Sequence, residues 1–133
     1  MDEKKEYRDW WERRDGVDLW SVPHLLFGVL MAIAPPFIGI SSHAAFITTV
    51  IASIAWEIFE KFTTVKESLE NIVFDVTFSI VGFLVASTLL LRYPTDRDVL
   101  VLAGLVFLAL YAFTIFSGWR AYRRRTRGRE PQT

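Results

Sequence analysis

The chain has 133 residues, of which 52% are hydrophobic and 23% are charged, and its 15 basic and 15 acidic side chains give a formal net charge of +0. The charges crowd into the first eighteen residues, the last fourteen and the stretch 57–75, and long apolar runs lie between them. This segregation argues against an ordinary soluble domain, and the absence of cysteine excludes disulfides and thiolate metal sites.

Residues 1–16 are predicted to form a short amphipathic helix that lies on the membrane surface. Tyr7, Trp10 and Trp11 can share one side of such a helix, while most of its acidic residues lie elsewhere. Trp and Tyr favour the membrane–water boundary because each has an apolar body and a polar tip. A solvated N-terminal arm is the alternative. The predicted interfacial anchors of the whole chain are Trp10, Trp11, Trp20 and Trp119.

Four apolar segments follow, and each is predicted to cross the membrane as a helix. They cover residues 19–37, 42–62, 67–91 and 96–119, each close to the roughly 20 residues that a helix needs to cross the hydrocarbon core. Pro35-Pro36 should end or kink the first of them. Because the connections are short, consecutive helices should be antiparallel neighbours. The sequence therefore predicts an all-α fold, a four-transmembrane-helix antiparallel bundle over 17–119, preceded by the interfacial helix and followed by a basic cytoplasmic tail over 120–133.

The distribution of Lys and Arg predicts the orientation of this bundle. With four spans, thirteen Lys and Arg side chains fall on one face and two, Arg92 and Arg97, on the other. Basic residues favour the cytoplasmic side, so a multi-pass protein of the plasma (inner) membrane with both termini in the cytoplasm is expected. The partners expected are the lipid bilayer, with anionic lipid at the Arg-rich tail, and no nucleic acid. The sequence leaves open whether the protein forms a homo-oligomer.

Polar and small side chains recur at helical spacing on three of the four predicted helices. In each helix they are three or four residues apart and therefore share one face. Small residues in such faces let membrane helices approach closely, so Gly28 and Gly82 are predicted helix-packing positions. The shared faces are Ser21, His24 and Gly28 in the first segment, Thr49, Ser53, Glu57 and Glu60 in the second, and Asn71, Asp75, Ser79 and Gly82 in the third.

Matched depth should bring several of these side chains toward one point near the cytoplasmic boundary. At about 1.5 Å of rise per residue, His24, Glu57 and Asn71 lie at similar depths. Asp75 lies one turn deeper and Glu60 one turn shallower. The predicted polar site is His24, Glu57, Glu60, Asn71 and Asp75.

The chemistry open to such a cluster is limited. His24, Glu57 and Asp75 offer ligands for a divalent metal ion. Without a metal, crowded acids would share or retain protons. We therefore expect a membrane protein that binds a metal ion or a polar lipid headgroup. A structural protein whose polar cluster only fixes helix packing is the first alternative, and a proton- or cation-coupled transport element is the second. The pattern assigns no catalytic residue and leaves enzymatic activity open.

Residues 18–86 resemble the VanZ-like and YjdF-type small bacterial membrane proteins. The motifs that carry the resemblance are Asp18 and His24 entering an early helix, Glu57-x-x-Glu60 ending another, and Asn71-x-x-x-Asp75 followed by Gly82. The spacing from Asp18 to His24 is longer than in those families, and the usual order of Asp and Asn is reversed. The resemblance implies a bacterial inner-membrane protein linked in some members to glycopeptide resistance or envelope stress.

Overall fold

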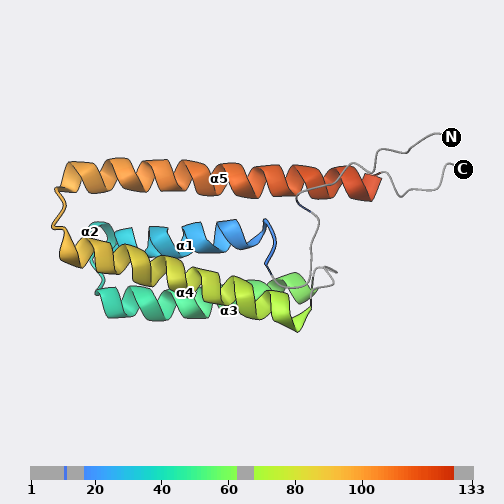
Figure 1. The fold of residues 1–133 in the computed structure, drawn as a ribbon, viewed down its shortest axis with the longest axis horizontal. Coiled ribbons are helices and arrows are strands. Elements are labelled where there is room, and N and C mark those ends of the chain that lie inside the picture. Colours follow the sequence, from blue (N-terminus) through green and yellow to red (C-terminus); the bar gives the residue numbers. More distant parts are fainter. Residues whose placement is uncertain (1–10, 12–16, 63–67, 128–133) are drawn as a thin grey trace, which may run out of the picture.

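The computed structural model describes Trp11, residues 17–62 and residues 68–127, with side chains as far as Arg124, and this part of the chain is helical apart from short connections (Figure 1). Within it, three helices are long and apolar enough to cross a membrane: α3 (Ser42–Phe62), α4 (Leu69–Arg92) and α5 (Arg97–Arg127). A shorter apolar helix, α1 (Ser21–Ile33), and a single turn, α2 (Pro35–Ile38), precede them. The predicted surface helix over 1–16 lies outside the described residues, except for Trp11.

The first predicted span, 19–37, is divided into α1 and α2. Pro35 and Pro36 have no N–H to donate to the preceding turn, so they begin a new helix instead of continuing α1. Gly39 then ends α2 in the left-handed region at φ 71°, where a side chain is disfavoured. The 13 residues of α1 measure about 20 Å at 1.5 Å per residue, less than the hydrocarbon thickness of about 30 Å.

The last helix is longer than its apolar segment. The predicted span ends at Trp119, whereas α5 continues into the basic segment to Arg127. Arg is a good helix former, and cationic side chains are favourable near a helix C-terminus because they complement the partial negative charge there. The predicted boundary between bundle and tail at residue 120 therefore lies inside one continuous helix.

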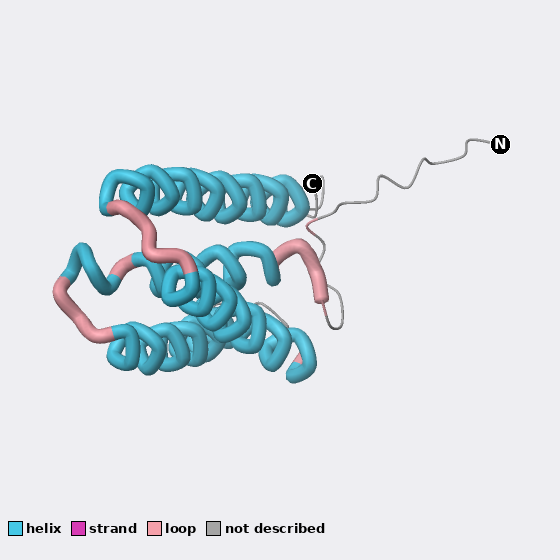
Figure 2. Tube along the Cα trace, turned by 60° about the vertical axis from the view of Figure 1, so that its left-hand side comes forward, coloured by secondary structure: helices cyan, strands magenta, loops and turns pink. Residues whose placement is uncertain are grey.

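Helix α1 lies between the other long helices, with α5 on one side and α3 and α4 on the other (Figures 1 and 2). It packs against all three, most extensively against α4. In Figure 1, α1 and α4 run in one direction and α3 and α5 in the opposite one. The start of α1, the end of α3 and the start of α4 consequently lie toward the same end of the molecule.

The interior is polar and the exterior apolar. The only large side chains among the buried hydrophobic residues are Leu26, Ile33 and Phe83, within the described part of the chain. Many long apolar side chains are exposed, and the apolar window of α5 has no buried residue. Exposure of an apolar surface of this extent to water is unfavourable, whereas its contact with lipid is not. The buried polar residues are Ser21, Thr49, Ser53, Glu57, Glu60, Asn71, Asp75 and Ser79.

Helices α1 and α4 approach to backbone contact at two glycines. A Cβ atom placed on Gly28 would overlap the backbone carbonyl of Ser79, and one placed on Gly82 would overlap that of Leu25. The two glycines therefore permit a crossing that no other residue type would allow. This close approach also brings the start of α1 against the start of α4, where the polar residues lie.

Candidate functional site

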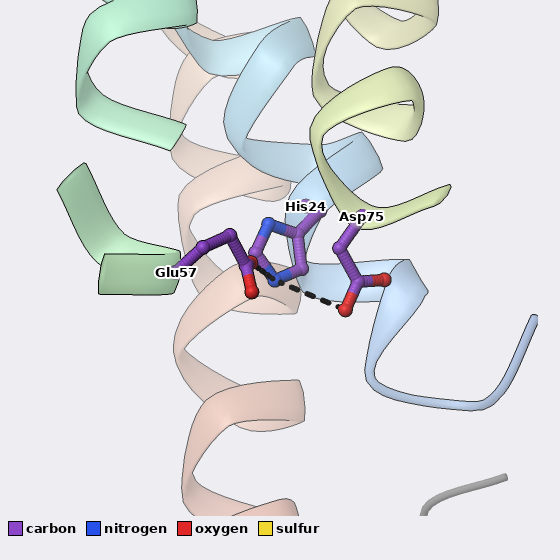
Figure 3. A group of neighbouring side chains, drawn as sticks. All are labelled: His24, Glu57 and Asp75. Carbon is purple, nitrogen blue, oxygen red and sulfur yellow. Dashed lines mark ion pairs between the residues drawn. The ribbon is translucent and has the colours of Figure 1, made fainter. Parts of the chain in front are cut away.

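Three ionisable side chains from three helices meet near one end of the molecule. His24 of α1 points between Glu57 of α3 and Asp75 of α4 (Figure 3). The His24 Nε2 atom lies 3.5 Å from Glu57 Oε1 and 3.8 Å from Asp75 Oδ2. One ligand atom from each residue lies within 4.8 Å of the other two. We call these three residues the triad.

The triad is withdrawn from the surface. The side chains of Glu57 and Asp75 are 3% and 0% exposed, and that of His24 is 12% exposed. Intramembrane carboxylates cost about 2.5–3.5 kcal/mol each even on the lenient insertion scale, so they persist where neighbouring groups compensate them. In this structure the His24 imidazole faces both carboxylates.

Asp75 is held by hydrogen bonds from two other buried residues. The Ser21 hydroxyl donates to Asp75 Oδ1 at 2.7 Å, which joins α1 to α4. The Asn71 amide donates from Nδ2 to Asp75 Oδ2 at 3.2 Å, one turn away on the same helix. These bonds fix the orientation of the carboxylate, as outer partners do for metal-binding carboxylates. The sequence places Ser21 on the polar face of its helix, and its spacing of three residues from His24 is the signal that points to a position beside the site.

The other two predicted site residues take different positions. Asn71 is 1% exposed and contacts Asp75 directly. Glu60 is also buried, at 9% exposed, one turn closer than Glu57 to the end of α3. Among the described residues, the group whose ligand atoms come together contains His24, Glu57 and Asp75 but not Glu60.

Aromatic residues gather at the same end of the helices. The Trp20 indole N–H donates to the Trp11 carbonyl at 3.0 Å, and the two rings meet edge to face with centroids 5.1 Å apart. Gly118 of α5 faces both rings, so this pair joins the start of α1 to α5. Trp119 packs edge to face on Tyr122, while Trp10 lies outside the described residues. Such amphipathic rings suit the headgroup level of a bilayer.

A half-open pocket of about 140 Å³ borders the triad on the His24 side, between α1, α3 and α5. Trp56 and Tyr111 line it together with His24. The sequence does not indicate this pocket, because Tyr111 belongs to a helix without ionisable residues between Asp98 and Arg120. Only the packing of α5 against α1 brings Tyr111 toward His24.

The net charge of the triad favours the binding of a divalent cation. Two carboxylates and a protonated imidazole would carry a net charge of −1 in a low-dielectric interior, whereas two carboxylates, a neutral imidazole and a divalent ion sum to zero. Imidazole nitrogen and carboxylate oxygen are both ordinary ligands of divalent metals. The described residues His24, Glu57 and Asp75 are thus able to hold a metal ion. Comparison with protein-family models, curated proteins and solved structures finds no match for the chain.

Proposed function

We propose that this protein is an integral membrane protein that binds a divalent metal ion through His24, Glu57 and Asp75. The observation that carries the proposal is the meeting of one imidazole and two carboxylates from three helices in an assembly with an apolar exterior, with their ligand atoms within 4.8 Å of one another. Scattered carboxylates would oppose insertion into a membrane, whereas carboxylates gathered around one ion compensate each other's charge.

The ligand set favours a first-row transition metal over Mg²⁺ or Ca²⁺. Mg²⁺ and Ca²⁺ take oxygen ligands, whereas one nitrogen with two carboxylates suits Mn²⁺, Fe²⁺ or Zn²⁺. Two ligands bonded to the same ion at about 2.1 Å can be at most about 4.2 Å apart. The 4.8 Å spread therefore requires a small inward rotation of the side chains on binding. Three protein ligands leave at least one position for water or an oxygen donor.

Metal analysis of the purified protein tests the proposal. We expect the full chain, stripped with a chelator and then titrated with Zn²⁺ or Mn²⁺ by calorimetry, to bind one ion per chain. Glu57→Gln and Asp75→Asn should each weaken binding at least about 100-fold, because even the loss of an outer partner costs about 10–100-fold. Glu70→Gln is the matched control, because Glu70 is an exposed acid in the first turn of α4 and lies outside the triad.

Two results would contradict the proposal. The first is the absence of bound metal in the wild-type protein, measured after the titration by elemental analysis with mass spectrometry. The second is equal affinity in the wild-type protein and in both triad variants, which would place any bound metal elsewhere.

The proposed arrangement in the membrane has four spans, with α1 and α2 together forming the first. The asymmetry of Lys and Arg supports it, as does the position of Trp20 and Trp119 near the ends of α1 and α5 that lie on the triad side. Both termini then face the cytoplasm of a bacterial cell, and the basic part of α5 meets anionic lipid. The resemblance to VanZ-like proteins implies a bacterial inner membrane and is part of the proposal.

Reporter fusions check this topology. Fusions at residues 40 and 94 should report the periplasm, and fusions at residue 64 and the C-terminus should report the cytoplasm. Because α1 is short, a tag at the N-terminus is needed to decide whether α1 crosses the membrane. Four spans place the tag in the cytoplasm, whereas three spans, α3 to α5, place it outside. Protease digestion of the tag in intact spheroplasts would contradict the four-span arrangement.

A structural role for the polar cluster is the second candidate. The hydrogen bond from Ser21 to Asp75 favours it, because that bond joins α1 to α4 at the level of the triad. Buried polar contacts can fix the register of packed helices without binding a ligand. In that case the triad variants would change thermal stability in the presence of a chelator but would have no effect on metal content.

A further inference from the structure

The pocket borders the proposed metal site at His24 and is less polar than that site. Most of its surface is apolar, and it is partly open to the outside of the helices that line it, α1, α3 and α5. The Ser53 hydroxyl, one of its few polar groups, already donates to the Thr49 carbonyl at 2.8 Å. A fully polar solute would find few partners in this pocket. The residues that form its walls include Phe27 and His24 of α1, Ala52 and Trp56 of α3, and Tyr111 and Ile115 of α5.

The pocket extends from the triad toward the interior of the helices. His24 is near the start of α1, and Phe27 lies about one turn further along it. Glu57 is near the end of α3, and Ala52 lies more than one turn further from that end. One turn corresponds to about 5.4 Å along the helix axis. His24 is therefore at the end of the pocket closer to the membrane surface, and Phe27 and Ala52 line its deeper part.

An amphiphile lies in a bilayer with its headgroup at the surface and its chain inward, and an ion at the triad followed inward by a mostly apolar pocket has the same order. The volume of about 140 Å³ is close to the roughly 150 Å³ of an engineered apolar cavity in another protein that binds benzene. The pocket is thus large enough for a short length of one alkyl chain, and the remainder of the chain can leave through the open side into lipid.

We infer that the ligand of the triad is an amphiphile with an anionic oxygen headgroup, whose chain begins in this pocket. The inference rests on the proposed metal ion, because two buried carboxylates would repel an anionic head if no cation were bound. An ion held by three protein ligands has a position for a phosphate or carboxylate oxygen. A bilayer is as apolar as the pocket, so the chain gains little by moving into it. The contact between headgroup and ion then supplies the affinity, and the pocket positions the chain.

Photolabelling of the full chain in phosphatidylcholine nanodiscs tests the inference. The probe is dodecyl phosphate carrying a diazirine in mid-chain, added in the presence of Zn²⁺ or Mn²⁺. We expect saturable labelling of peptides that line the pocket, which excess dodecyl phosphate prevents and which inorganic phosphate or dodecanol prevents poorly. EDTA should abolish this labelling. Phosphatidic acid as a second competitor shows whether a bilayer lipid or only a free alkyl phosphate is accepted.

Two alanines on α3 provide a matched pair of variants. Ala52 lines the pocket, and Ala55→Phe serves as control because Ala55 is exposed outside it. A Phe ring at position 52 is about as large as the benzene that such a cavity holds. Ala52→Phe should therefore lose the saturable labelling and keep the metal, whereas Ala55→Phe should keep both.

The possible outcomes separate this inference from the metal proposal. If the metal binds but the pocket is not labelled, or if Ala52→Phe is labelled like the wild-type protein, the inference is wrong and the metal proposal stands. If labelling is equally strong in EDTA, the link between headgroup and ion is wrong. If no metal binds at all, calorimetry shows this without the probe, and both proposals fail.

Discussion

Replacing Gly28 by Ala is expected to destabilise the protein by about 1–3 kcal/mol or more, although it adds a single methyl group. The new Cβ would overlap the backbone carbonyl of Ser79 and lie 2.8 Å from the backbone nitrogen of Phe83. Backbone atoms of a packed helix cannot rotate away as a side chain can, so α1 and α4 must separate. Separation would weaken all the other contacts of the most extensive helix pair, including the hydrogen bond from Ser21 to Asp75.

Gly82→Ala should have a similar effect, because its Cβ would overlap the backbone carbonyl of Leu25 on the facing helix. The control is Gly104→Ala in α5, where the nearest atom to an added Cβ is the Ile33 Cγ2 at 3.7 Å, an ordinary contact. Since Ala is a better helix former than Gly by about 1 kcal/mol, this variant should be neutral or stabilised. Thermal unfolding in detergent, followed by circular dichroism, measures all three variants.

The double variant with Gly28→Ala and Gly82→Ala further tests the close crossing of α1 and α4. Once one substitution has separated the helices, the second has less to disrupt, so the two effects should be less than additive. If Gly28→Ala and Gly82→Ala both unfold at the temperature of Gly104→Ala, the close crossing of α1 and α4 is wrong.

Replacing Asp75 by Ala should cost about 2–5 kcal/mol of folding stability even without a metal. The carboxylate accepts hydrogen bonds from the Ser21 hydroxyl and the Asn71 amide, and all three residues are buried. Removing it would leave both donors without this acceptor in an environment that water does not reach. A buried donor that loses its acceptor costs about 1–3 kcal/mol. Denaturation in the presence of EDTA isolates this structural contribution from any effect of a bound ion.

Ser79→Ala is the matched control for this experiment. Ser79 lies one turn from Asp75, is equally buried, and its hydroxyl donates only to the Asp75 carbonyl of its own helix at 3.3 Å. Its loss should therefore change stability by less than about 1 kcal/mol, because the carbonyl is already part of the helix. Equal stability of Asp75→Ala and Ser79→Ala in EDTA would show that Asp75 does not join the helices.

Some features of the molecule followed from local patterns in the sequence. The apolar stretch 42–62 coincides with α3, and the stretch 67–91 differs from α4 by two residues or fewer at each end. The length and the apolarity of a helix depend on a run of neighbouring residues, so both can be predicted from the sequence alone. The break at Pro35-Pro36 was also visible, because proline acts on its own turn. The extension of α5 to Arg127 does not follow from the apolar pattern, because residues with high helix propensity, such as Arg, continue the helix beyond the end of its apolar segment.

The candidate site depended both on local sequence patterns and on the packing of the helices against one another. The 3.6-residue period determined that Asn71, Asp75 and Ser79 share one face of α4 and that Ser53 and Glu57 share one face of α3. A period does not determine distances between helices. The tertiary structure alone decided that His24 lies 3.5 Å and 3.8 Å from the two carboxylates, while Glu60 stays outside the triad. It also placed Tyr111 of α5 in the same pocket as His24, because the packing of α5 against α1 is not encoded by the spacing of residues in either helix.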